Sequence, residues 1–179
     1  GGVAGDVMGQ DCQEMKALHD PDETVLDEEL TRAMTPFSQK PGDVTVLRNR
    51  LQDVMWEDVG VMRDADGLQR GLKRIAEIDD ELSSVGVAAD NLAFNLSWHD
   101  WLNLRSLIDM SMVIAKAALS RENSRGAHFR EDFPDAGAMQ ESYFTLASGY
   151  GDAISVTRAP VQFTICLLYT SDAADDRCC

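Results

Sequence analysis

Three runs of apolar residues at helical spacing occupy the middle of this sequence, and they restrict its fold more than any other feature. The first run follows Asp43, a suitable N-cap, and the second covers residues 68–82. The third covers residues 98–121 after a predicted cap at Ser97, and it is apolar over more than half of its circumference. Such a helix is typically central and packs against several neighbours. We therefore predict three antiparallel helices in a small bundle.

The apolar positions define the predicted core. They are Leu47, Leu51, Val54, Met55, Val59 and Met62 in the first run, Leu68, Leu72, Ile75, Ile78 and Leu82 in the second, and Trp101, Leu104, Leu107, Ile108, Met110, Ile114, Ala115, Ala118 and Leu119 in the third. Residues 64–67 are expected to form a break or kink between the first two runs. Trp56 lies among acidic residues of the first run and is expected to pack in the core.

Shorter elements are predicted on both sides of the bundle. Helices are expected over 1–18 and 27–34, and β-like runs over 142–146 and 153–156 flank a glycine-containing hairpin signal. The fold class is therefore mainly α: a three-helix-bundle-like domain followed by a short β-hairpin region.

Composition excludes several classes of function. The 179 residues suffice for one core, and a net charge of −15 argues against nucleic acid as a partner. No apolar run approaches the roughly 20 residues that would predict a transmembrane segment. Three of the four cysteines lie within the last fourteen residues, which leaves Cys12 alone in the body of the chain. That distribution fits a reducing cytosol and predicts no zinc or other metal site.

The densest cluster of chemically active side chains is Ser-Arg-Gly-Ala-His-Phe-Arg-Glu-Asp-Phe-Pro at residues 124–134. Arg125, His128 and Arg130 could bind a carboxylate, since arginine offers a two-pronged donor and histidine a titratable one. The alternative, which residue chemistry alone favours, is an irregular loop whose arginines pair with nearby carboxylates. His99 and Asp100 do not form a predicted dyad, because adjacent helical residues point apart. Dinucleotide-binding, phosphate-loop and nucleophile-elbow motifs are absent from the sequence.

Three ordered segments carry a family resemblance: residues 51–63 with 67–72, residues 103–108, and residues 124–134. Together they resemble the C-terminal region of the succinate dehydrogenase/fumarate reductase flavoprotein subunits, which have aspartate oxidase relatives. The likeness extends over roughly residues 43–164.

The resemblance implies a parent FAD-dependent oxidoreductase that acts on dicarboxylates. This chain would supply the helical C-terminal domain that braces the flavin-binding and capping domains, and it would be inactive and without bound cofactor when alone. Arg125, His128 and Arg130 would serve as an inter-domain anchor more than as catalysts. The implied partners are those two domains, with an iron–sulfur subunit left open, and the implied location is the cytoplasm or the inner face of a membrane. The alternatives are a non-enzymatic helical interaction module and a fragment of an L-aspartate oxidase-like enzyme.

The resemblance also predicts a division of the chain. Residues 1–42 would end the flavin-binding domain and connect it to the helical bundle of 43–134, and residues 135–165 would form a truncated β region. The sequence lacks an initiator Met, so we expect it to begin within a longer protein. Residues 166–176 resemble the translation of a transposase-type sequencing-library adapter. We therefore predict that 166–179 is a non-native tail and exclude it from functional reasoning.

Overall fold

The computed structural model describes residues 2–15, 20, 22–88, 90–138, 142–149 and 153–161. The chain forms two compact units, Gly1–Thr35 and Pro36–Cys179. The predicted non-native tail lies outside the described residues, as do residues 16–19 of the first predicted helix. The functional division at residues 42, 134 and 165 stays a prediction.

The first unit contains two helices, α1 (Gly2–Glu14) and α2 (Glu23–Met34), neither of which has a buried residue. Helix α2 begins four residues before the predicted start at 27, because the side chain of Asp22 accepts a hydrogen bond from Thr24 N and caps it. A short 3₁₀ helix, Thr35–Phe37, follows.

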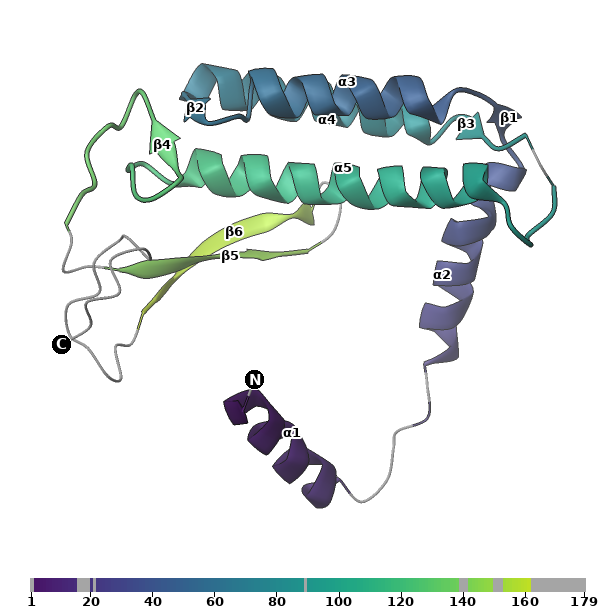
Figure 1. Ribbon diagram of the computed structural model, residues 1–179, viewed down its shortest axis with the longest axis horizontal. Coiled ribbons are helices and arrows are strands. Elements are labelled where there is room, and N and C mark those ends of the chain that lie inside the picture. Colours follow the sequence, from purple (N-terminus) through teal and green to yellow (C-terminus); the bar gives the residue numbers. More distant parts are fainter. Residues whose placement is uncertain are drawn as a thin grey trace. The chain divides into compact units, whose positions relative to one another are not determined.

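The second unit is built on three long helices, α3 (Val44–Glu57), α4 (Ala65–Leu82) and α5 (Leu96–Ser120). They pack pairwise against one another, and successive helices run in opposite directions (Figure 1). Asp43 caps α3 as predicted, since its carboxylate accepts from Thr45 N at 2.9 Å. The prediction of a small antiparallel bundle is confirmed.

The break between the first two bundle helices lies earlier than predicted. Helix α3 ends at Glu57, and Met62 belongs to a two-residue strand, β2 (Met62–Arg63), where its side chain is 64% exposed. Asp64 is the N-cap of α4 and accepts from Gly67 N at 2.6 Å, so residues 65–67 are helical rather than kinked. Pairing of β2 with a distant strand overrides the helical spacing here, which a local pattern cannot reveal.

Helix α5 begins two residues earlier than its predicted start, and its cap is Asn95 rather than Ser97. The buried Asn95 side chain accepts from Trp98 N at 3.0 Å and donates to Asn91 O at 2.9 Å. Ser97 is exposed in the first turn. Both residue types are good caps, and the two hydrogen bonds of Asn95 explain why the helix begins there.

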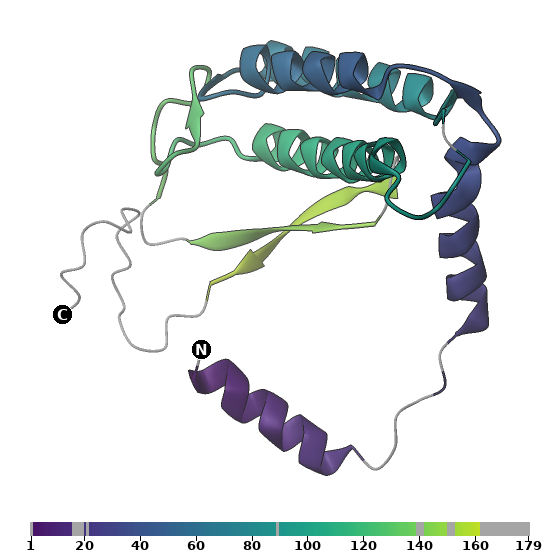
Figure 2. The same cartoon turned by 45° about the vertical axis from the view of Figure 1, so that its right-hand side comes forward.

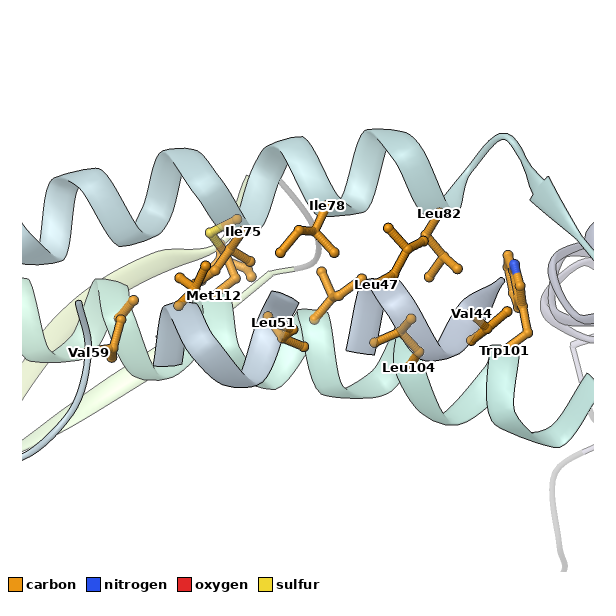
Figure 3. Packing of buried hydrophobic residues seen from close by; sticks show 14 of the residues in the cluster. Val44, Leu47, Leu51, Val59, Ile75, Ile78, Leu82, Trp101, Leu104 and Met112 are labelled. Atoms are coloured by element: carbon orange, nitrogen blue, oxygen red, sulfur yellow. The ribbon is translucent and has the colours of Figure 1, made fainter. Parts of the chain in front are cut away.

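Side chains from all three helices meet in one hydrophobic core (Figure 3). Its fully buried members include Leu47, Val54, Leu68, Ile75, Ile78, Leu82, Leu104 and Ile108. Trp101 adds a polar tie, because its indole N–H donates to Val85 O at 2.8 Å. Most of the apolar positions that were predicted to form the core are indeed buried.

Besides Met62, four predicted core residues lie at the surface instead. On α5, Leu107, Met110 and Ile114 are exposed, so the apolar circumference of this helix is wider than the part that packs. Trp56, expected in the core, is 81% exposed near the end of α3. Trp56 does not belong to the series of buried apolar residues on α3. It lies on the acidic face of the helix, which faces the solvent.

A β-hairpin packs against α5 on the side away from α3 and α4 (Figures 1 and 2). Strands β5 (Tyr143–Ser148) and β6 (Ser155–Pro160) pair antiparallel with Thr145 opposite Arg158. The predicted hairpin is confirmed with longer strands, although the centre of its turn, 150–152, is outside the described residues. Lys116 Nζ donates to Ile154 O at 3.2 Å and thereby ties α5 to the start of β6.

Two parallel strand pairs of two residues each close the ends of the bundle. Strand β1 (Lys40–Pro41) pairs with β3 (Val85–Gly86), and β2 pairs with β4 (Phe129–Arg130). Glycine is required at position 86, because a Cβ there would lie 2.3 Å from Gln39 O. The second pair brings residues 124–134 against the turn between α3 and α4. No helix among the described residues is long and apolar enough to cross a membrane.

Candidate functional site

Arg130 is the centre of the predicted functional cluster, and it is buried at 1% exposure. Its Nη1 lies 3.1–3.2 Å from the carbonyl oxygens of Ala118, Leu119 and Arg121, at the end of α5. Carbonyls in the last turn of a helix lack the usual N–H donor four residues on, and of these three only Ala118 O also accepts from a described backbone N–H, that of Arg121 at 3.2 Å. The guanidinium therefore completes the helix terminus. The ring of Phe133 lies 5.0 Å from the guanidinium carbon and covers it.

Asp132 pairs with the other edge of the same guanidinium. Its carboxylate accepts from Arg130 Nε at 2.7 Å and from Nη2 at 2.6 Å, and it also accepts from Ala65 N at 3.0 Å. The hydrogen bonds from Arg130, helped by the Ala65 amide, lower the pKa of Asp132 to about 2. One ion pair therefore joins the first turn of α4 to the last turn of α5.

His128 lies beside this ion pair and contacts Arg63 of strand β2. Arg63 Nη1 donates to His128 Nδ1 at 2.9 Å, and Arg63 Nε donates to the carbonyls of Val59 and Gly60. A guanidinium can only donate, so Nδ1 carries no proton and the imidazole is the neutral form protonated at Nε2. That nitrogen lies 3.4 Å from Arg121 O. We call Arg63, His128, Arg130 and Asp132 the α4–α5 junction.

The neutral state of His128 makes the junction sensitive to acid. Burial lowers the pKa of His128 below its ordinary value of 6.5, and the charges of Arg121, Arg63 and Arg130 lower it further. The folded chain therefore takes up this proton at a lower pH than the unfolded chain does. The stability that His128 contributes is complete above about pH 6.5 and is lost as the pH falls through the lowered pKa.

We expect the free energy of unfolding to fall between about pH 7 and about pH 5, with His128 responsible for part of the slope. Urea denaturation followed by circular dichroism across this range measures it. The variant His128→Gln should show a shallower slope, whereas His99→Gln, on an exposed position of α5, should keep the wild-type slope. Equal slopes for the wild type and His128→Gln would contradict this assignment.

Arg125 holds the following loop rather than the helices. Its Nε donates to Ala136 O at 2.5 Å and its Nη2 to Ala138 O at 2.6 Å. The backbones of Arg125 and His128 exchange two hydrogen bonds across a tight turn, in which Gly126 has a φ of 57°. That left-handed conformation favours glycine and explains the Arg-Gly-Ala-His order.

The structure thus brings His128 and Arg130 into one junction and places Arg125 at its edge. Arg63 is the member that sequence reasoning missed. In the sequence, Arg63 was noted only as the last residue of the segment 51–63. Its contact with His128, 65 residues away in the sequence, depends on the pairing of β2 with β4. His99 and Asp100 are separate from this cluster, and Asp100 pairs instead with Arg48 at 3.5 Å.

The junction is suited to holding elements together more than to chemistry. Every nitrogen of the Arg130 guanidinium is hydrogen-bonded within the bundle, and His128 is 7% exposed. A substrate could not reach Arg130 without displacing one of these partners. Among the described residues, no group of three or more His, Cys, Asp and Glu could hold a metal ion.

Comparison with known proteins identifies the wider context of this junction. The sequence pattern of the family described as fumarate reductase flavoprotein C-term matches residues 48–173, which include α3 from Arg48 onward, all of α4 and α5, and the whole junction. The chain belongs to this family. Its members' shared pattern explains the ordered segments at 51–72, 103–108 and 124–134.

Individual relatives agree with the family. An uncharacterized FAD-dependent oxidoreductase of Methanocaldococcus jannaschii is 32% identical over 135 residues, which are 74% of this chain and 24% of that protein. The succinate dehydrogenase flavoprotein subunit of Rickettsia bellii is 31% identical over 138 residues, 74% of this chain and 23% of that subunit. In structure, Sdh1 of Mycobacterium smegmatis in complex with UQ1 matches with a TM-score of 0.67 at 26% identity, covering 84% of this chain and 26% of that one.

This chain spans about a quarter of the length of these two relatives. Its described residues do not fit a dinucleotide cofactor. The parallel strand pairs are two residues long, and nothing in the described part resembles the longer parallel sheet on which a dinucleotide-binding fold is built. We therefore derive no chemical step at a flavin from the residues of this chain.

Proposed function

We propose that this chain is the C-terminal helical domain of an FAD-dependent oxidoreductase of the succinate dehydrogenase/fumarate reductase type. The parent enzyme would oxidise or reduce a carbon–carbon bond between carboxylated carbons and exchange hydride with FAD. The observation that carries the proposal is the family match over residues 48–173. Because the matching family is that of the fumarate reductase flavoproteins, we favour a parent of this type over an aspartate oxidase-like parent.

The role of the domain in that enzyme would be positional. Helices α3, α4 and α5 share one core, and the α4–α5 junction closes one end of it with a buried ion pair. A rigid body of this kind can hold flavin-binding and capping domains in register, where small displacements change turnover strongly. Arg125 and His128 would anchor the loop 121–138 that faces those domains.

The wider assembly follows from the same proposal. The domain would pack on the flavin-binding and capping domains of its own polypeptide, and an iron–sulfur subunit is the candidate partner in a respiratory complex. The proposed location is the cytoplasm or the inner face of a membrane, reached through partner subunits.

The test uses the longer parent protein, obtained by extending the reading frame upstream. We expect the full-length protein to bind FAD and to oxidise succinate or reduce fumarate, with the 179-residue chain alone binding no flavin. His128→Gln and Arg125→Gln in the parent should lower flavin content and turnover together, because they loosen the anchor. Arg50→Gln, at an ion pair on the bundle surface, is the control and should change neither.

Two results would contradict this proposal. If the 179-residue chain bound FAD tightly or turned over a dicarboxylate unaided, the bracing role would be wrong. If His128→Gln abolished turnover while flavin content and domain assembly stayed normal, direct catalysis would replace anchoring.

A further inference from the structure

The described arginines of the second unit differ in their partners, and two of them, Arg125 and Arg158, donate to backbone carbonyls. Six others form ion pairs with described carboxylates: Arg48, Arg50, Arg70, Arg74, Arg105 and Arg130. Arg63 and Arg121 have no carboxylate within ion-pair distance among the described residues. This is unexpected in a chain with 31 acidic and 16 basic residues, where negative charge is plentiful.

Arg121 is the less satisfied of the two. Its Nε is buried and has no hydrogen-bond partner within the described ranges, and its Nη2 makes one long hydrogen bond to Asn123 Oδ1 at 3.4 Å. A buried donor without a partner destabilises a protein, more so when the group is charged. The backbone of Arg121 terminates α5, so this guanidinium is held at a fixed place in the fold.

Arg63 and Arg121 both lie against His128: Arg63 Nη1 donates to its Nδ1 at 2.9 Å, and the Arg121 carbonyl lies 3.4 Å from its Nε2. Burial lowers the pKa of Arg63, and the charge of Arg121 lowers it further. The same two arginines disfavour a proton on His128. Positive charge is therefore concentrated at the C-terminal end of α5, where Arg130 is ion-paired with Asp132 but Arg63 and Arg121 form no ion pair with a described carboxylate.

We propose that Arg121 and Arg63 form a binding site for a carboxylate. A guanidinium fork matches the two oxygens of a carboxylate, as the Arg130–Asp132 pair of this unit shows. A singly charged group also suits two guanidiniums better than a polyanion, which the net charge of −15 would repel.

The source of the carboxylate is either a side chain of the longer flavoprotein or a free carboxylic acid. The first source rests on the proposed function. A side chain of the same polypeptide would occupy the site even if the site bound a free carboxylate only weakly. A group on the same polypeptide is present at an effective concentration in the millimolar range, so millimolar binding would fill the site.

The test is a titration of the 179-residue chain with sodium acetate, followed by NMR of the arginine Nε–Hε groups at constant ionic strength set by sodium chloride. We expect the Arg121 signal to shift and saturate at millimolar acetate, with little response to chloride alone. Arg121→Lys keeps the charge but loses the fork and should weaken binding roughly tenfold. Arg50→Gln is the matched control and should bind as the wild type does.

Three results would overturn the site: no saturation beyond the chloride baseline, unchanged binding in Arg121→Lys, or tighter binding of inorganic phosphate than of acetate. Succinate distinguishes the sources. Binding much tighter than that of acetate would assign the site to a free dicarboxylic acid, and equal weak binding would assign it to a tethered side chain. The titration involves no flavin, so its outcome is independent of whether the parent proves to be a dicarboxylate oxidoreductase.

Discussion

Replacing Arg130 by Met is expected to lower the free energy of unfolding by about 3–5 kcal/mol. The substitution leaves the Asp132 carboxylate without its guanidinium and leaves the carbonyls that end α5 without their donor. Because Arg130 is 1% exposed, water cannot reach the carbonyls that it serves, although it can reach the Asp132 side chain, which is 30% exposed. Urea denaturation monitored by circular dichroism would measure the change.

The control for this prediction is Arg50→Met. Arg50 pairs with Glu81 on the surface of α3 and α4, where ion pairs contribute at most about 1 kcal/mol. If Arg130→Met does not fold, Asp132→Asn reports on the same ion pair from its more exposed side. Stability losses below about 1 kcal/mol in both Arg130→Met and Asp132→Asn would show that the junction does not hold the helices together.

The second large effect is expected in the hydrophobic core, where Leu104→Ala should cost about 2–5 kcal/mol. Leu104 is fully buried on α5 and lies among side chains of α3 and α4 (Figure 3). Removal of its side-chain methyl groups leaves a cavity that three packed helices cannot easily fill. Thermal and chemical denaturation of the same variant should agree.

Leu107→Ala is the matched control, since it makes the same chemical change one turn along the same helix. Leu107 is 48% exposed, so its loss should stay within about 1 kcal/mol. Similar losses at both positions would mean that α5 packs along a different face from the one described.

The contrast between these two leucines shows what the sequence could predict. Helical spacing correctly located the three helices and most of their buried positions, because apolar periodicity reports directly on which residues can share a face. It could not rank Leu104 above Leu107 on a helix that is apolar over most of its circumference. That distinction depends on where α3, α4 and the hairpin lie around α5, which is tertiary information.

The candidate site was predictable in part for a similar reason. The motif at 124–134 identified Arg125, His128 and Arg130, because its charged and titratable side chains are close together in the sequence. Arg63 and Arg121 were missed because their importance comes from contacts, or absent contacts, between distant segments. The end of α3 was misjudged because the β2–β4 pairing interrupts an otherwise regular stripe, and Trp56 was misjudged because its position lies between the stripe residues, on the outward face.

In the Arg130–Asp132 ion pair, it matters which charge lies at which helix end. Backbone dipoles give the start of a helix a partial positive charge and its end a partial negative charge. Asp132 sits at the start of α4 and Arg130 at the end of α5, so each side chain opposes the partial charge that it meets. Exchanging the two residues would preserve an ion pair in principle but place both charges at repelling termini. The antiparallel order of the helices therefore dictates the polarity of the pair as well as its place in the fold.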